Sequence, residues 1–237
     1  MLFNKSTSLF GQYINLLKDY YHVQTFSQLL RSISSDFFVS IFLFAGSGLI
    51  TSVLKGFIAR LFIRSGFPLL IGKRGKIMHP YNMIFGKYVW IRDDVSLMAH
   101  GKLVLGDNVV IGDQSIIWTN GKGLKIGSNT GIGFRCYIAQ LGGPITIGKN
   151  VLIADSVRIH SLNHKYEDTT KDILLQGYVK STIVIEDNVW IGSGAIVFNN
   201  VTIGKGSVIG ANTVVSENVP PFVVFAGNPG KVIKRLK

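Results

Sequence analysis

A six-residue pattern that recurs from residue 85 to residue 213 constrains this chain more than any other feature. Each repeat has an aliphatic residue, a small residue, two variable residues, and then a small or β-branched residue. Clear copies are Leu105-Gly106-Asp107-Asn108-Val109, Ile126-Gly127-Ser128-Asn129-Thr130 and Ile147-Gly148-Lys149-Asn150-Val151. Aliphatic side chains six residues apart stack inward when each repeat forms one flat face of a coil, so the pattern predicts a β-helix.

The spacing of the repeats divides the chain into coils. Paired repeats begin at residues 85, 105, 126 and 147, which are 20, 21 and 21 residues apart, so two or three residues are inserted per coil. The next pair begins at residue 185, and this spacing of 38 leaves a loop of twenty residues beyond one coil. The glycine after the aliphatic residue lies where the chain turns a corner, so it provides either a positive φ or close packing.

Residues 1–64 follow a different pattern, and we expect them to be α-helical. Over residues 5–33 large apolar residues recur three and four positions apart, as in a helix with one apolar face. Phe37–Leu54 then has no charged residue, and its length lies at the lower limit of about 17–25 residues for a membrane span. Because Ala45-Gly46-Ser47-Gly48 interrupts it, we favour a helix–turn–helix that packs on the domain or lies in the bilayer interface.

These patterns divide the chain into three parts. We expect the helical segment at 1–64, a β-helix domain at 65–219 with a loop at 160–182, and a tail at 220–237. A stack of coils needs a cover at each end. The N-terminal helices are the candidates for one end, and the tail from Pro220 is the candidate for the other.

Charge and composition limit the class of protein and its partners. With 47% hydrophobic and 16% charged residues, the chain is not intrinsically disordered. The single cysteine, Cys136, excludes a disulfide framework and a multi-thiolate metal site. Residues 1–84 hold nine Lys and Arg but only two acids, which predicts peripheral contact of 1–64 with an anionic membrane. The basic residues match no nucleic-acid-binding motif, so we expect no nucleic acid partner.

The last fifty residues carry a family resemblance. The motifs are Val189-Trp190-Ile191-Gly192-Ser193-Gly194-Ala195, Val201-Thr202-Ile203-Gly204, Val208-Ile209-Gly210-Ala211, Val219-Pro220-Pro221 and Ala226-Gly227-Asn228-Pro229. They resemble the acetyl-CoA-binding end of the hexapeptide-repeat acyltransferase superfamily, and the likeness extends over roughly residues 65–237. The fold that this implies is mainly β: a left-handed parallel β-helix of hexapeptide repeats, here with an N-terminal α-helical segment.

The layout of the chain resembles one branch of that superfamily. The apolar N-terminal segment and the loop from Asn163-His164-Lys165-Tyr166 to Gln176-Gly177 are similar to those of O-acetyltransferases that modify bacterial surface polysaccharides. The resemblance implies acetyl-CoA as co-substrate, a saccharide hydroxyl as acceptor, no metal, and a homotrimer with active sites between subunits. A lipid-linked saccharide would explain both halves of the chain, so we expect the bacterial cytoplasm, at the inner face of the cytoplasmic membrane.

Acetyl transfer from a thioester needs a base for the acceptor proton and a donor for the oxyanion. Histidine is the natural base near neutral pH. His164, preceded by Asn163 where the chain leaves the coil, matches the superfamily's catalytic position, and we assign it as general base. His160 is the neighbour that shapes the pocket or orients the base. The candidates for the acidic partner of the base are Asp155, Glu167, Asp168 and Asp172.

The resemblance also assigns the acceptor and coenzyme sites. Trp190 lines the acceptor or acetyl pocket or else packs between subunits, and Asn163 and Tyr166 are further acceptor candidates. Backbone amides at four corner residues would hold the pantetheine, although the same residues also turn the coil: Gly192, Ser193, Gly210 and Ala211. Lys231, Lys234 and Arg235 would bind the nucleotide phosphates. Many relatives have a lysine near the position of Glu217. This chain has no lysine there to contact a phosphate, and Ser216 offers only a hydroxyl group.

Three other functions share parts of this pattern. A β-helical carbonic anhydrase needs three histidines around one zinc, whereas only His160 and His164 are close in this sequence, and His22, His79 and His100 receive no catalytic role. A scaffold or membrane-bound assembly subunit would not bind a thioester donor. A transferase for an antibiotic or a serine-type acceptor would have no need of the apolar N-terminal segment.

Overall fold

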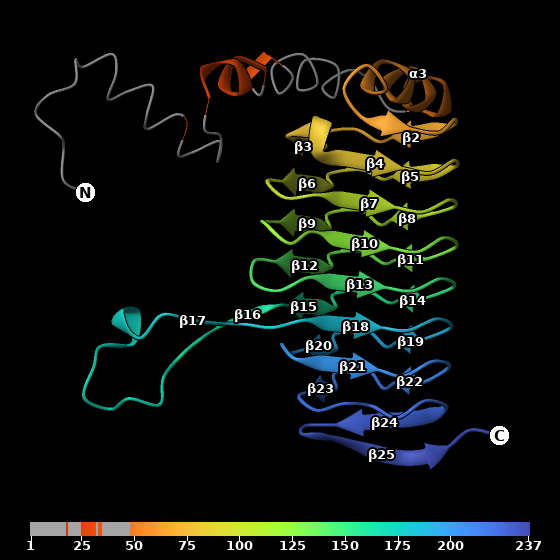
Figure 1. Cartoon of the computed structure of the whole chain (residues 1–237). Helices are drawn as coiled ribbons and strands as arrows, with labels where there is room; N and C mark the ends of the chain where they lie inside the picture. The colour runs from red at the N-terminus through yellow and green to blue at the C-terminus, as the bar shows by residue number, and fades with distance from the viewer. Residues whose placement is uncertain (1–17, 19–24, 32, 35–47) are drawn as a thin grey trace, which may run out of the picture.

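The computed structural model describes residue 18 and residues 25–31, 33–34 and 48–237. From residue 64 the chain winds into a parallel β-helix in which three sheets form the faces of a prism (Figure 1). Neighbouring strands within each sheet come from successive coils and pair in parallel register, except for the final pair of one sheet. The prediction of a mainly β, hexapeptide-repeat β-helix is therefore confirmed.

The strands of each sheet follow one another along the helix axis. Sheet A contains β1 (Arg64–Ser65), β4 (Met83–Phe85), β7 (Leu103–Leu105), β10 (Leu124–Ile126), β13 (Ile145–Ile147), β18 (Ile183–Ile185) and β21 (Val201–Ile203). Sheet B contains β2 (Leu69–Ile71), β5 (Val89–Ile91), β8 (Val110–Ile111), β11 (Gly131–Ile132), β14 (Leu152–Ile153), β19 (Trp190–Ile191), β22 (Val208–Ile209), β24 (Val223–Gly227) and β25 (Gly230–Arg235). Sheet C contains β3 (Lys76–Met78), β6 (Ser96–Ala99), β9 (Ile116–Thr119), β12 (Tyr137–Gln140), β15 (Arg158–His160), β20 (Ile196–Val197) and β23 (Val214–Val215).

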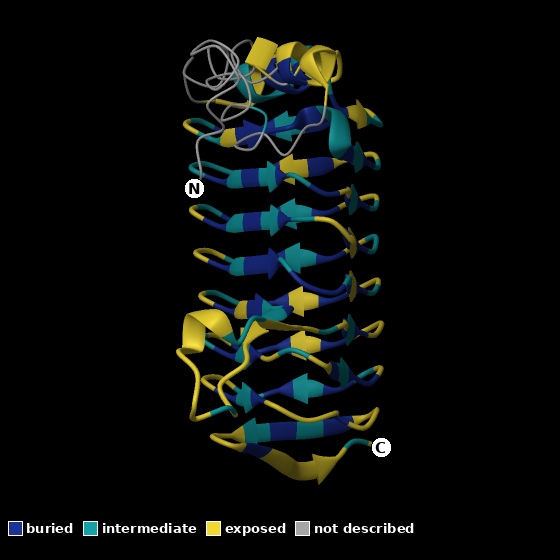
Figure 2. Ribbon diagram, turned by 60° about the vertical axis from the view of Figure 1, so that its left-hand side comes forward, coloured by how far each residue is buried: buried dark blue, intermediate teal, exposed yellow. Residues whose placement is uncertain are grey.

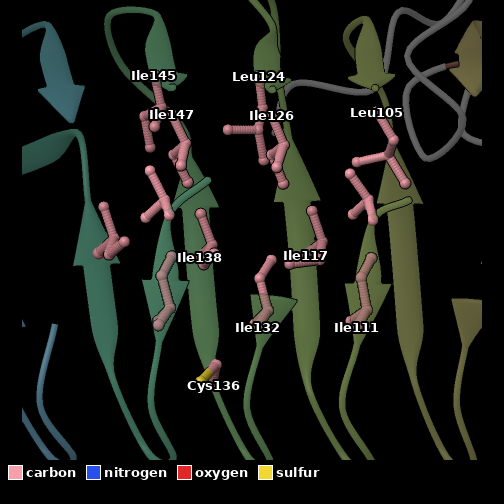
Figure 3. Packing of buried hydrophobic residues seen from close by; sticks show 14 of the residues in the cluster. Leu105, Ile111, Ile117, Leu124, Ile126, Ile132, Cys136, Ile138, Ile145 and Ile147 are labelled. Carbon is pink, nitrogen blue, oxygen red and sulfur yellow. The ribbon is translucent and has the colours of Figure 1, made fainter. Parts of the chain in front are cut away.

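The core is a set of aliphatic columns along the axis of the prism (Figure 3). Leu105, Ile126 and Ile147 pair in register across β7, β10 and β13, and each is at most 2% exposed. Equivalent columns in the other sheets contain Ile111, Ile132, Ile153, Ile117, Ile138 and Ile159. Burial of each such side chain stabilises the fold by about 1.5–3 kcal/mol, so the six-residue spacing of the aliphatic residues dictates the coil.

The corners show why the repeat contains both glycine and asparagine. The fourth residue of the repeat has a positive φ, and asparagine, which tolerates this conformation, occupies it at Asn108, Asn129 and Asn150. The asparagines also form a ladder, in which Asn108 Nδ2 donates to Asn129 Oδ1 at 2.9 Å. A Cβ on the second-position Gly127 would lie 2.5 Å from the carbonyl oxygen of Gly148 in the next coil. Close packing, not a positive φ, therefore requires the repeat glycine.

Secondary structure covers both ends of the stack (Figure 2). Helix α3 (Leu49–Ala59) packs against β2, and a Cβ on its Gly56 would overlap the Leu69 carbonyl group. At the other end β25 folds back antiparallel onto β24. The 3-10 helix η1 (Pro80–Asn82) joins β3 to β4. Both predicted covers are thus present.

The predicted apolar run Phe37–Leu54 is described only in part. Residues 37–47 lie outside the described residues, as does His22. Helix α3 begins after Gly48, the last residue of the predicted interruption. Within the part of the chain that the structure describes, no helix has the length and apolar character needed to cross a membrane.

The long loop forms an arm that leaves the prism between β15 and β18 (Figure 1). Its base is an antiparallel pair of strands, β16 (Leu162–His164) and β17 (Tyr178–Lys180). Its tip contains the 3-10 helix η2 (Ile173–Leu175). The Gln176 side chain closes the tip, because its Oε1 accepts from the Asp168 amide at 3.1 Å and its Nε2 donates to the Asp168 carbonyl at 2.9 Å. The arm is therefore held by its own hydrogen bonds.

Candidate active site

His164 lies at the base of the arm, at the end of β16. Its cross-strand partner is Tyr178 of β17, and the two rings are tilted by 50° with centroids 4.6 Å apart. The amide of His164 donates to Asn163 Oδ1 at 3.0 Å, which fixes the backbone next to the imidazole. Both His164 and Asn163 are exposed. The predicted base is thus held by a short hairpin and exposed, and its ring contact with Tyr178 is a feature that the sequence pattern alone did not show.

His160 lies on the outer surface of sheet C, in β15, immediately before the arm. Its ring centroid is 5.1 Å from that of Tyr137, one coil away on β12. Burial, and to a lesser extent the charge of Arg158, holds the pKa of His160 below its ordinary value. His160 is therefore neutral at pH 7, in the form that accepts a proton or a hydrogen bond.

The lowered pKa of His160 makes the stability of the protein depend on pH. The unfolded chain takes up this proton near pH 6.5, whereas the folded chain takes it up only at lower pH. We expect the contribution of neutral His160 to the free energy of unfolding to be complete above about pH 6.5. This contribution should fall as the pH decreases towards the folded-state pKa of His160. Thermal midpoints measured between pH 8 and pH 5 check this: His160→Gln should lose less stability than the wild type on acidification. An equal loss in both proteins would contradict it.

The predicted coenzyme residues Gly192, Ser193, Gly210 and Ala211 stack at one edge of the prism, between sheets B and C. A Cβ on Gly192 would lie 2.7 Å from the Ala211 amide nitrogen, so the two coils are in close contact there. The amides of Gly192 and Gly210 donate to coil carbonyl groups at 2.8 and 2.9 Å. The two glycines therefore provide a flat surface, and not the hydrogen-bond donors that we predicted.

The amides of Ser193 and Ala211 differ from those at the same corner of three upper coils. There an aspartate of the next coil caps the amide: Asp93 Oδ1 accepts from Lys73 at 2.9 Å, and Asp155 Oδ1 accepts from Phe134 at 2.9 Å. The position below Ser193 is Ala211, whose methyl group cannot accept a hydrogen bond. Among the described residues the amides of Ser193 and Ala211 donate no hydrogen bond, and neither does the amide of Asp155 one coil above. Open amides therefore continue along this edge over three successive coils.

The predicted phosphate-binding cations are spread along β25. Lys231 pairs with Ala226, which lies directly below Gly210, so it continues the edge formed by Gly192 and Gly210. Lys234 and Arg235 lie farther along β25, opposite Val224 and Val223, on the face of sheet B. All three cations are exposed. Lys231 is therefore the cation that the fold aligns with the glycine edge.

The other predicted site residues lie elsewhere on the prism. Ser216 follows β23 at the edge between sheets C and A, which is the edge that carries the arm. Trp190 is 50% exposed on the outer face of sheet B, in register with Leu152 and Val208. Tyr166 is 66% exposed on the arm. In one chain, sheet C thus separates the edge of His164 from the edge of Gly192.

The four candidate acids have other contacts or none. Asp155 caps the Phe134 amide, and Asp168 pairs with Lys171 at 2.7 Å and with the Thr170 amide at 3.1 Å. From residue 48 to residue 237, no carboxylate hydrogen-bonds the His164 imidazole within this chain.

His79 is 1% exposed and its Nδ1 lies 3.0 Å from the Tyr81 hydroxyl oxygen. No three His, Cys, Asp or Glu side chains among the described residues gather as a metal site would require.

Comparison with known families identifies the repeats. Residues 182–217 match the family model of the bacterial transferase hexapeptide (six repeats). Residues 123–155 match that of the hexapeptide repeat of succinyl-transferase. A putative acetyltransferase of Dictyostelium discoideum is 38% identical over 161 residues, which cover 68% of this chain and 80% of the relative. The chain belongs to the hexapeptide-repeat acetyltransferases.

Other hexapeptide-repeat acetyltransferases and their solved structures show the same likeness. The galactoside O-acetyltransferase of Escherichia coli K12 is 33% identical over 165 residues, 69% of this chain and 78% of the relative. The crystal structure of the polySia specific acetyltransferase NeuO aligns with a TM-score of 0.52 and 27% identity, over 70% of this chain and 78% of that one. AntD, an N-acyltransferase from Bacillus cereus crystallised with coenzyme A and a dTDP-amino sugar, aligns with a TM-score of 0.57 and 22% identity, over 76% and 88% of the chains.

Proposed function

We propose that this acetyltransferase moves an acetyl group from acetyl-CoA to a hydroxyl group of a saccharide, with His164 as general base. The observation that carries the proposal is the exposed imidazole at the base of the arm, which contacts the Tyr178 ring and hydrogen-bonds no other group among the described residues. Such a group can accept a proton from a bound hydroxyl group. The galactoside and polySia acetyltransferases to which the chain is similar support a saccharide acceptor and, for the former, an O-linked product.

The reaction needs few steps from this chain. The His164 imidazole removes the proton of the acceptor hydroxyl as its oxygen attacks the thioester carbonyl carbon. The carbon–sulfur bond then breaks, and the imidazolium returns the proton to the leaving thiolate, so that the products are an O-acetyl saccharide and free coenzyme A. The developing oxyanion needs an N–H donor, and half-exposed Trp190 and exposed Tyr166 offer aromatic faces on which a sugar ring can stack.

The coenzyme fits the edge between sheets B and C. Ser193 and Ala211 present open amides in successive coils, and Lys231 extends the same edge with a positive charge. An extended pantetheine arm pairs with stacked amides, and the phosphates of the nucleotide pair with a cation. The solved AntD structure contains coenzyme A on a related fold, which agrees with this choice of donor.

The two halves of this site lie on different edges of one prism, so we propose that they meet between subunits of a homotrimer. The arm of one subunit would then bring His164 to the glycine edge of its neighbour. Exposed apolar residues at the arm tip support a contact of this kind, since Leu174 and Leu175 are 83% and 75% exposed in one chain.

Turnover of acetyl-CoA, measured as free thiol, tests the proposal against a panel of galactosides, sialic acid oligomers, amino sugars and serine. We expect saccharide-dependent release, a hydroxylamine-labile acetyl ester in the product, and a particle mass near three times the 26.0 kDa of the chain. An alkali-stable amide would identify an N-acyltransferase instead. Failure of coenzyme A to raise the thermal midpoint would contradict the transferase function and favour a scaffold.

A further inference from the structure

The two faces of helix α3 carry the reverse of the side chains expected for a helix that covers a core. Its face against the prism contains two small residues, Gly56 and Ala59, and the buried Lys55, whose Nζ donates to the Gly72 carbonyl at 3.4 Å. Its outer face contains the large apolar side chains, of which Ile50, Leu54 and Phe57 are 84%, 58% and 62% exposed. A surface helix normally buries its large apolar residues, so this outer face is built for an apolar environment.

The outer face of α3 forms one continuous apolar surface. A groove of about 470 Å³ is lined only by apolar side chains, those of Leu49, Ile50, Val53, Leu54, Phe57 and Phe67. The exposed residues recur about one helical turn apart, so they form one stripe along the helix. Soluble proteins rarely leave a contiguous apolar surface of this kind uncovered.

Two unpaired cations lie beside this apolar surface. The Arg60 guanidinium lies 5.8 Å from the centroid of the Phe67 ring, at the border of the groove, and Arg64 is exposed in β1. Farther along the chain Lys73, Arg74 and Arg92 pair with aspartates, whereas Arg60 and Arg64 have no ion-pair partner among the described residues. Residues 37–54, which lead into α3, have no charge at all. Large apolar side chains beside these two unpaired cations match the acyl boundary and the headgroups of an anionic bilayer.

We infer that the outer face of α3 docks this enzyme on an anionic lipid bilayer, with the groove residues in the acyl boundary and Arg60 and Arg64 among the headgroups. The prism then stands on the membrane by its N-terminal end, because α3 covers that end (Figure 1). In sheet C four inter-strand steps separate β3 from β15, which precedes the arm. At about 4.8 Å per step, His164 lies roughly 19 Å from the first coil, measured along the axis of the prism. The inference does not depend on the identity of the acceptor.

Flotation of the full chain with vesicles tests this inference. The vesicles contain phosphatidylcholine with or without phosphatidylglycerol, and the variants are Leu54→Glu, the pair Arg60→Glu and Arg64→Glu, and Phe222→Glu. Phe222 provides the matched control, because it is a large apolar residue, 52% exposed against 58% for Leu54, at the opposite end of the prism. Thermal midpoints and free-thiol release on a soluble acceptor show that each variant is folded, and they report on the transferase function separately.

We expect the wild type and Phe222→Glu to bind vesicles that contain phosphatidylglycerol, and to bind pure phosphatidylcholine at least fivefold less. Leu54→Glu should lower the partition coefficient at least tenfold, and the arginine pair at least fivefold. Binding that is unchanged in Leu54→Glu would overturn the inference. So would a wild type that ignores both vesicles while Leu54→Glu reduces its particle mass, because a second copy of the chain would then cover the groove.

Discussion

Replacement of His164 by alanine is expected to lower kcat for saccharide acetylation by about 10²–10⁴-fold, the usual contribution of a general base. The imidazole lies at the base of the arm, where its ring contacts that of Tyr178. Because the side chain is exposed, its loss should leave the thermal midpoint within about 2 °C of the wild type, as for most surface substitutions. Steady-state release of free thiol at saturating saccharide measures this effect.

Two controls separate catalysis from binding in this experiment. Coenzyme A should raise the thermal midpoint of His164→Ala as much as that of the wild type, because the proposed coenzyme contacts come from Ser193, Ala211 and Lys231 and not from the imidazole. Tyr178→Phe, which keeps the ring beside His164, should retain most of the activity. If turnover survives in His164→Ala, the base is another residue, and neutral His160 is the next candidate.

Replacement of Gly127 by alanine is expected to destabilise the protein by about 2–3 kcal/mol, the cost of forcing an atom into a close-packed site. The added Cβ would lie 2.5 Å from the Gly148 carbonyl oxygen, and its three nearest atoms are all backbone atoms of the next coil, which cannot rotate away as a side chain could. For a chain of this length we expect the thermal midpoint to fall by roughly 5–10 °C. The position is one coil removed from the arm, so the experiment reports on the coil itself.

Gly131 provides the matched control, four residues farther along the same coil. A Cβ there would meet its nearest atom, Leu152 Cδ1, at an ordinary 3.7 Å, and its φ is not positive. Gly131→Ala should therefore change the stability by less than about 1 kcal/mol, with a gain expected from the lower entropy of the unfolded chain. Equal losses in both variants would show that close approach between coils is not what the repeat glycine provides.

The site was harder to predict than the fold, because its residues come from several coils. The sequence placed His164 where the chain leaves the stack, and the structure places it at the base of the arm. It did not show Tyr178 beside that ring, because thirteen residues of arm separate the two along the chain. Nor did it show that Ser193 and Ala211, and not the neighbouring glycines, have open amides. That difference arises because the glycine amides donate to carbonyl groups of the next coil, whereas no acceptor of the next coil meets the amides of Ser193 and Ala211.

The six-residue period of the aliphatic residues by itself determined the β-helix. Each coil repeats the same inward positions, so Ile126 can stack only on Leu105 and Ile147. It also determined the length of the arm and the presence of a cover at both ends. Tertiary structure alone decided how the faces and edges are used. The direction in which α3 presents Phe57, and the separation of His164 from Gly192 by sheet C, depend on how coils rotate and stack. Local patterns report which residues turn inward, whereas neighbours on the surface are set by contacts between coils that are distant in sequence.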